Sequence, residues 1–147
     1  MRLIDVARSY LRHAEARLRD AQEALAEGLY PYALRLSQEC VELSLKAALR
    51  IVGIEYPKRH DVSDVLVMAK ERFPEWFRDE IDFLADTSRR LAKKREVSMY
   101  GDEALMLSPD EVVSREEARA AVESAEKTYS LCKRMLNEHE KAHLGSS

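Results

Sequence analysis

The sequence predicts an all-α protein, an up-and-down antiparallel bundle of four long helices and one short helix. Its 147 residues include only four Gly and four Pro, whereas Ala, Leu, Glu and Arg, which favour helices, are abundant. Apolar residues also recur at steps of three and four, the period of a helix that buries one face. This length suits one domain, which we expect to span residues 1–144, with residues 145–147 as a disordered tail.

The segment 32–52 is the expected central helix, because apolar residues occur almost all the way round its helical wheel. Such a helix contacts neighbours on several sides inside a bundle. Pro31 suits its first turn and Gly53 suits a left-handed stop after it. Its polar residues form one narrow stripe, made of Arg35, Gln38, Glu39, Glu42, Lys46 and Arg50. The stripe is either a solvated ridge with pairs such as Glu42–Lys46, or the lining of a cleft or interface.

Two further helices are expected on either side of this segment. The first covers about residues 3–27, where apolar residues form a single stripe, and it ends at Gly28. The connection to the central helix has only about two residues, so the two helices should be antiparallel neighbours. The short helix is expected over residues 62–72, after a loop in which Pro57 prevents a regular helix.

The second half of the chain supplies the other two long helices. Pro74 starts one of them, which should begin at about residue 75 and continue to about residue 97. An irregular segment follows over residues 100–114, and loops of this length inside a compact domain tend to be functional or mobile. The capping box from Ser114 to Glu117 then begins the last helix.

Composition excludes several classes of function. The net charge of −3 argues against nonspecific nucleic-acid binding by the whole surface, although a local basic patch is compatible with it. Cys40 and Cys132 lie on predicted apolar faces, as reduced core thiols of an intracellular, cytoplasmic protein do. No apolar run approaches the ~20 residues of a membrane span, and no membrane association is expected. Metal spacings and Gly-rich phosphate loops are missing from the sequence, so we expect no cofactor and no metal.

The basic segment 89–95 is one candidate site for anions, because it holds five cations in seven residues: Arg89, Arg90, Lys93, Lys94 and Arg95. One interpretation is a solvated helix end, where cations complement the helix dipole. The other is a phosphate-binding rim beside the turn from Tyr100 to Asp102.

Histidines are the other candidates. His60 lies in a loop and could serve as a base or bind phosphate, or it could bond a backbone carbonyl or cap a helix. His139 and His143 are four residues apart and could coordinate a metal, but the sequence offers no third ligand.

Several stretches match the motifs of one known family. They are Gly28-Leu-Tyr30-Pro-Tyr32-Ala33, the block from Gln38 to Leu49, Lys58-Arg59-His60-Asp61, the stretch from Arg95 to Asp102, and Ser114-Arg-Glu-Glu-Ala118. Over about residues 3–140 the chain resembles a HEPN domain (higher eukaryotes and prokaryotes nucleotide-binding). The resemblance implies a helical bundle that is usually a homodimer. It also implies kinship with ribonucleases, which are often prokaryotic toxins encoded beside a minimal nucleotidyltransferase antitoxin.

In those ribonucleases an Arg, followed after four to six residues by His, forms a metal-independent active site across the dimer. The resemblance implies that His would act as acid or base at the RNA 2′-OH, and that Arg would hold the phosphate. Counting from Arg95, this chain has Tyr100, Gly101 and Asp102 where the His should be. Tyrosine is a poor base, because its ordinary pKa is about 10.

The resemblance and this departure predict a noncatalytic module that binds a nucleotide, RNA or a nucleotidyltransferase partner. Arg95 would hold a phosphate and Tyr100 would stack on a base, and the further candidate ligands are Lys94, Arg90, Lys46 and His60. The alternative is a divergent metal-independent ribonuclease toxin that uses Arg95 with Tyr100, Asp102 or His60. A third interpretation is a structural dimer in which the irregular segment packs against a partner chain.

Overall fold

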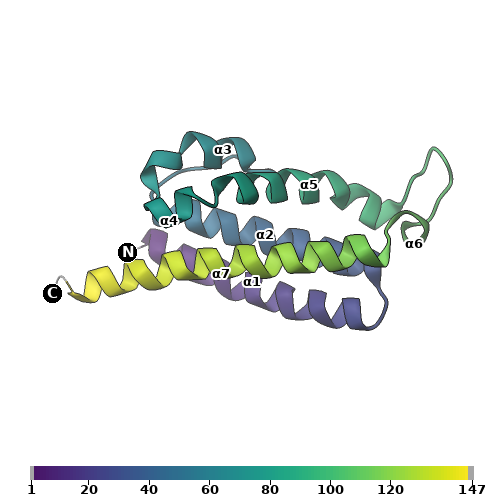
Figure 1. Cartoon of the computed structure of the whole chain (residues 1–147), viewed down its shortest axis with the longest axis horizontal. Coiled ribbons are helices and arrows are strands. Elements are labelled where there is room, and N and C mark those ends of the chain that lie inside the picture. The colour runs from purple at the N-terminus through teal and green to yellow at the C-terminus, as the bar shows by residue number, and fades with distance from the viewer. Residues whose placement is uncertain (1, 146–147) are drawn as a thin grey trace.

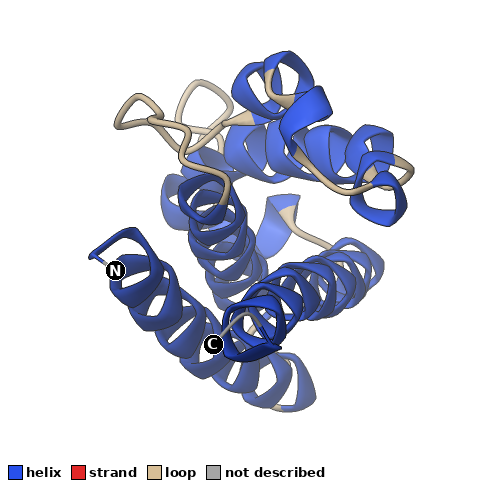
Figure 2. Cartoon of the chain, turned by 90° about the vertical axis from the view of Figure 1, so that its left-hand side faces the viewer, coloured by secondary structure: helices blue, strands red, loops and turns tan. Residues whose placement is uncertain are grey.

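Four long helices form an antiparallel bundle in the computed structural model, which describes residues 2–145 (Figure 1). They are α1 (Arg2–Ala26), α2 (Tyr30–Ile51), α5 (Ile81–Tyr100) and α7 (Arg115–Gly145). The connections contain α3 (Ser63–Met68), the 3-10 turn η1 (Lys70–Arg72), α4 (Glu75–Arg78) and α6 (Pro109–Val112). The all-α bundle is confirmed, although it has more short helices than the one expected. Figure 2 shows helices and loops throughout the part of the chain that the structure describes, and no strand.

Helix α2 is the centre of the bundle, as its apolar surface predicts, because it packs against α1, α5 and α7. Its buried side chains belong to one core with residues of those helices, among them Leu11, Leu84 and Leu136. Pro31 lies in its first turn, and Gly53 follows it with φ +75°. A helix that contacts three neighbours in this way fixes the relative positions of side chains on all of them.

The other predicted helix boundaries also agree with the structure where short-range rules set them. Gly28 has φ +77° after α1, and the capping box of α7 is formed. In that box the N–H of Glu117 donates to Oγ of Ser114 over 3.1 Å, and the N–H of Ser114 donates to Oε1 of Glu117 over 3.3 Å. Gly145 is the last residue of α7, and residues 146–147 of the expected tail lie outside the described residues.

The single helix expected over residues 75–97 is instead two helices, α4 and α5, because the chain turns between them. The ring of Phe77 stacks on Phe73 with 4.4 Å between centroids, and Trp76 packs edge-on against Phe77. These contacts hold α4 against the core. The N–H of Glu80 then bonds to the carbonyl of Phe77 over 2.9 Å, and this tightened turn redirects the chain into α5.

The segment after α5 is irregular, as expected, and it projects beyond the end of the bundle (Figure 1). Asp102 and Leu107 form an isolated bridge in which each N–H donates to the other's carbonyl over 2.9 Å. Gly101 enters this bridge with φ +71°, and a Cβ there would lie 2.1 Å from the carbonyl oxygen of Leu107. Only glycine therefore fits where α5 ends and the loop begins.

Both cysteines are fully buried, Cys40 in α2 and Cys132 in α7, as their apolar positions predict. Burial raises the pKa of the Cys40 thiol to about 12 and raises the pKa of Cys132 as well. Among residues 2–145 no helix has both the length and the apolar character that crossing a membrane requires.

Candidate functional site

Two residues of the polar stripe of α2, Glu39 and Glu42, line a cleft of about 270 Å³. Its walls come from α1, α2, α5 and the loop before α3, and they consist of Arg17, Glu39, Glu42, Leu43, His60 and Arg95. Two further polar residues of the stripe, Gln38 and Lys46, are only 2% and 9% exposed. The expected Glu42–Lys46 pair is also formed. Part of the stripe therefore lines a cleft, as in the second interpretation, and Glu42 of the expected ion pair belongs to that lining.

Arg95 points from α5 across to α2. Its Nη1 donates to Oε1 of Gln38 over 2.6 Å and to Oε2 of Glu39 over 3.1 Å. The Arg95 side chain is 22% exposed and lines the cleft. Hydrogen bonds to a charged group are stronger than neutral ones, and these two contacts fix the arginine that the sequence singled out.

Glu39 is held by arginines from three helices. Its carboxylate accepts from Arg17 of α1 over 3.0 Å, from Arg35 of α2 over 3.4 Å, and from Arg95 of α5. Burial by itself raises the pKa of the Glu39 carboxyl, but hydrogen bonds from Arg17 and Arg95 oppose this, so the pKa lies below its ordinary value. Glu39 is therefore a carboxylate anion at neutral pH.

Glu42 is the second anionic centre of the cleft. Its carboxylate accepts from Nζ of Lys46 over 2.8 Å and from Nε2 of Gln38 over 2.9 Å. Nδ1 of His60 lies 2.6 Å from the same group. Burial raises the pKa of the Glu42 carboxyl, but hydrogen bonds from Lys46, Gln38 and His60 lower it below its ordinary value overall. Since Gln38 contacts both Glu42 and Arg95, one network connects His60 to Arg95.

His60 is positioned by the loop that precedes α3. The next residue, Asp61, accepts the backbone N–H of Ser63 and the hydroxyl of Ser88 on α5, which ties the loop to that helix. The His60 side chain is 53% exposed, so its ring is accessible from solvent while one nitrogen contacts Glu42.

The structure brings Arg95, Lys46 and His60 together, but the other candidates lie elsewhere. Tyr100 is 58% exposed at the end of α5. Five residues along a helix correspond to a rotation of about 140°, so Tyr100 and Arg95 face different sides. Asp102 is in the bridge with Leu107, and neither Tyr100 nor Asp102 lines the cleft. Their contact with a ligand stays a prediction.

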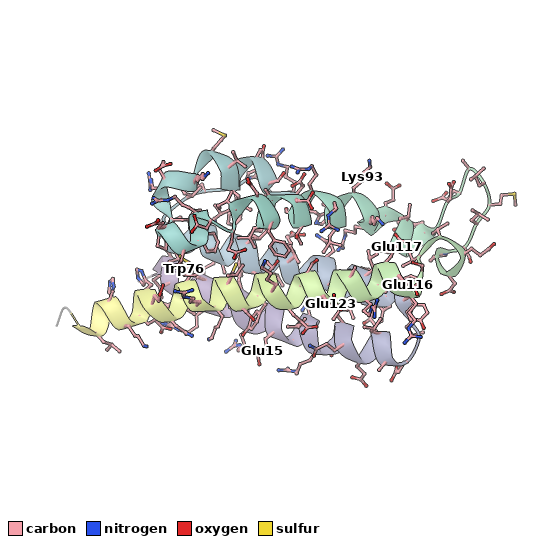
Figure 3. The ribbon with its side chains drawn as sticks, viewed as in Figure 1. Glu15, Trp76, Lys93, Glu116, Glu117 and Glu123 are labelled. Carbon is pink, nitrogen blue, oxygen red and sulfur yellow. The ribbon has the colours of Figure 1, made fainter. Side chains whose placement is uncertain are left out.

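The basic side chains of segment 89–95 point in several directions, because they follow one another along a helix. Arg90 pairs with Asp86 over 2.7 Å, and Lys94 pairs with Glu117 of α7. Lys93 points outward from α5 (Figure 3). Of this segment only Arg95 lines the cleft, so the other cations do not form one patch with it.

His139 and His143 lie next to each other on α7. The rings of His139 and His143 stack with 4.5 Å between centroids. Among residues 2–145 there is no group of three His, Cys, Asp or Glu side chains that could hold a metal ion.

Arg17 is the site residue that sequence reasoning missed. It lies three residues after Ala14 and four before Ala21, and both of these alanines are fully buried. This spacing places Arg17 at the edge of the buried stripe of α1, and a cation at such an edge is the signal that could have identified it.

Comparisons with known proteins agree with this architecture. The family model described as HEPN domain matches residues 7–135. The crystal structure of ST0689, an archaeal HEPN homologue, superposes with a TM-score of 0.69 and 25% identity, covering 88% of this chain and 97% of that chain. The crystal structure of TT1696 from Thermus thermophilus superposes with a TM-score of 0.70 and 26% identity, with the same coverage. No curated protein matches the chain.

Proposed function

This chain belongs to the HEPN domain family, and we propose that it is a noncatalytic module that binds a nucleotide or RNA in the cleft beside α2. The observation that carries this proposal is the position of Arg95. Hydrogen bonds through Gln38 and Glu42 connect it to Lys46 and His60 in one network. Guanidinium, ammonium and imidazole groups are the side chains that proteins use for phosphate.

The charges around the cleft support an anionic ligand. Four basic side chains, Arg17, Arg35, Lys46 and Arg95, contact two carboxylates, those of Glu39 and Glu42. The surplus of positive charge is local, since the whole chain carries −3. A local positive field in a recessed site attracts phosphate groups.

A titration tests this function. ATP and a short single-stranded RNA are titrated separately into the wild type, into Arg95→Ala and into Arg89→Ala. Arg89 is on the same helix but outside the cleft, so its variant controls for the loss of one positive charge. We expect Arg95→Ala to weaken binding by about tenfold or more, as the loss of a charge-assisted hydrogen bond implies, and Arg89→Ala to change it little. Equal, negligible binding by wild type and Arg95→Ala would reject the proposal.

We propose a second role for the end of the bundle where α5 ends and the loop after it projects. This role is contact with another protein chain. Leu105 and Met106 in the projecting loop are 68% and 90% exposed, and Leu29 at the start of α2 is 47% exposed. Leu105 and Met106 are neighbours on this loop, and adjacent exposed apolar side chains are typical of protein interfaces. The family resemblance suggests a homodimer and a nucleotidyltransferase encoded nearby, as in a toxin–antitoxin pair. Light scattering that gives a monomer would contradict the homodimer.

A divergent ribonuclease is the second candidate function, and one observation favours it. His60 shares the cleft with Arg95, and a carboxylate contacts its Nδ1. An imidazole oriented by a carboxylate is a common general base. This arrangement would supply from another part of the chain the histidine that does not follow Arg95.

A further inference from the structure

Three arginines from three different helices converge on the single carboxylate of Glu39. Arg17, Arg35 and Arg95 donate to it through Nε, Nε and Nη1 over 3.0, 3.4 and 3.1 Å. Among the residues that the structure describes, no other carboxylate contacts three guanidinium groups in the ion pairs. The convergence is therefore a particular property of Glu39: Arg17 and Arg95 line the cleft at this place, and Arg35 reaches the carboxylate from outside that lining.

The cluster carries more positive charge than Glu39 neutralises. Three guanidinium groups and one carboxylate leave a net charge of two positive units. Each guanidinium has five N–H donors, and these contacts use one nitrogen from each arginine, so donors remain for a second anion. Like charges held this close repel one another, and an arrangement of this kind favours binding of a multivalent anion.

A carboxylate at the centre of three arginines has the geometry of one edge of a phosphate group. Arginine forks bind carboxylate and phosphate oxygens with the same bidentate pattern. The Glu39 side chain is only 19% exposed, and the carboxylate sits where an oxygen atom of an incoming phosphate would find its strongest donors.

Two features select a terminal phosphate over an internal one. A phosphate monoester carries up to two negative charges and three free oxygens, which match the net charge and the three arginines, whereas an internal phosphodiester carries one charge and two such oxygens. The cleft has a volume of about 270 Å³, near the lower end of the range of about 300–1,000 Å³ typical of ligand pockets. It has room for the phosphate end of a larger molecule.

We propose that Arg17, Arg35 and Arg95 form a site for a terminal phosphate monoester, and that Glu39 is an internal anion which the ligand displaces. The proposal rests on the nucleotide- or RNA-binding function above and names the group that the site recognises. A 5′-mononucleotide and the 5′-phosphorylated end of an RNA share this chemistry. Displacement by rotation of one glutamate side chain requires no movement of the helices.

The test is isothermal titration calorimetry with two matched pairs of probes. One pair is adenosine and AMP, and the other is an RNA pentamer with a 5′-hydroxyl and the same pentamer with a 5′-phosphate. We expect the phosphorylated member of at least one pair to bind about tenfold more tightly or better, as charge-assisted contacts imply. Preference within the first pair identifies a free nucleotide, and preference within the second identifies an RNA end.

Three variants test the role of each part of the cluster. Glu39→Gln keeps the shape of the side chain but removes the competing anion, so it should tighten binding of the phosphorylated probe by about three- to tenfold. Arg17→Gln removes one guanidinium of the cluster and should weaken binding of the phosphorylated probe by about tenfold. Glu123→Gln removes one exposed carboxylate from α7 (Figure 3) and should leave the affinity unchanged. Thermal unfolding of each variant checks that it is folded.

The outcomes separate this inference from the function on which it rests. If no probe binds the wild type, both fail. If the 5′-hydroxyl and 5′-phosphate RNAs bind equally and AMP does not bind, the binding module survives and the monoester site is overturned. If Glu39→Gln binds the phosphorylated probe no more tightly than the wild type, Glu39 is not the displaced anion and the proposal is likewise overturned.

Discussion

Nδ1 of His60 lies 2.6 Å from Oε1 of Glu42, eighteen residues earlier in the chain. This contact fastens the loop before α3 to the central helix. Glu42 simultaneously accepts from Lys46, whose side chain is 11% exposed, and from Gln38. One carboxylate therefore positions a histidine of the cleft together with a lysine and an amide beside it, and the consequences of removing it can be measured.

Replacing Glu42 should destabilise the fold. Glu42→Ala leaves Lys46 charged and largely buried without its carboxylate, and breaking a partly buried ion pair on one side costs about 2–3 kcal/mol. Asp86→Ala is the control, because Asp86 pairs with the exposed Arg89 and Arg90, and such pairs contribute less than about 1 kcal/mol. Urea denaturation gives both free energies of unfolding. Equal losses in the two variants would show that the Glu42 network contributes nothing beyond a surface pair.

Stability should fall in acid through Glu39 and Glu42. The pKa of each carboxyl is lowered in the folded protein, so below the ordinary carboxyl pKa of about 4.3 the unfolded state binds more protons than the native state. Their contribution is complete above that value and is lost as the pH falls through the lowered pKa values. The urea midpoint of the wild type should therefore decline from about pH 4.5 downward.

The double variant Glu39→Gln/Glu42→Gln should show a shallower decline over the same pH range, because neither position can then take up a proton. It should also start from a lower stability at pH 7. A decline as steep as that of the wild type would assign the acid sensitivity to other carboxylates.

Gly101 should not tolerate a side chain. Gly101→Ala places a Cβ against the carbonyl of Leu107 in a backbone with φ +71°, and the strain and the clash together cost about 2 kcal/mol or more. Gly53→Ala is the matched control, since Gly53 has φ +75° but nothing within 4 Å of its Cβ, and it should cost only about 1 kcal/mol. Hydrogen exchange of the Asp102 and Leu107 amides reports the loop directly. Unchanged protection in Gly101→Ala would contradict this role.

Incubation with labelled RNA distinguishes the binding module from the ribonuclease. We expect the pure wild type not to cleave RNA, because tyrosine stands where the family ribonucleases have histidine. Cleavage that disappears in His60→Ala would support a nuclease in which His60 is the base. Cleavage that disappears instead in Tyr100→Phe would assign that role to Tyr100, and either result would overturn the noncatalytic function.

The sequence predicts most of the helices here, because short-range rules determine where they begin and end. Gly28, Gly53 and the capping box from Ser114 to Glu117 act within a few residues of themselves, and the apolar surface of α2 identifies the central helix. The turn between α4 and α5 could not be predicted, because it depends on how Phe77 stacks on Phe73 in the core.

The site was predictable only where a local sequence pattern contains its residues. The family motif predicted Arg95, and the polar stripe on α2 predicted Lys46. Their connection through Gln38 and Glu42 depends on how α5 packs on α2, which no local pattern encodes. Linear spacing brought Tyr100 close to Arg95 in the sequence, but the helix turns the two side chains to different sides. Conversely, Arg17 is far from Arg95 in the sequence, and both reach Glu39.

The two cysteines have a practical consequence for such measurements. Because Cys40 and Cys132 are 0% exposed and burial raises the pKa of both thiols, the native chain should react very slowly with maleimides. A cysteine introduced at exposed Met106 can then be labelled with a fluorophore while the two natural thiols are kept. The same natural thiols become reactive only when the chain unfolds, so their rate of modification reports global unfolding.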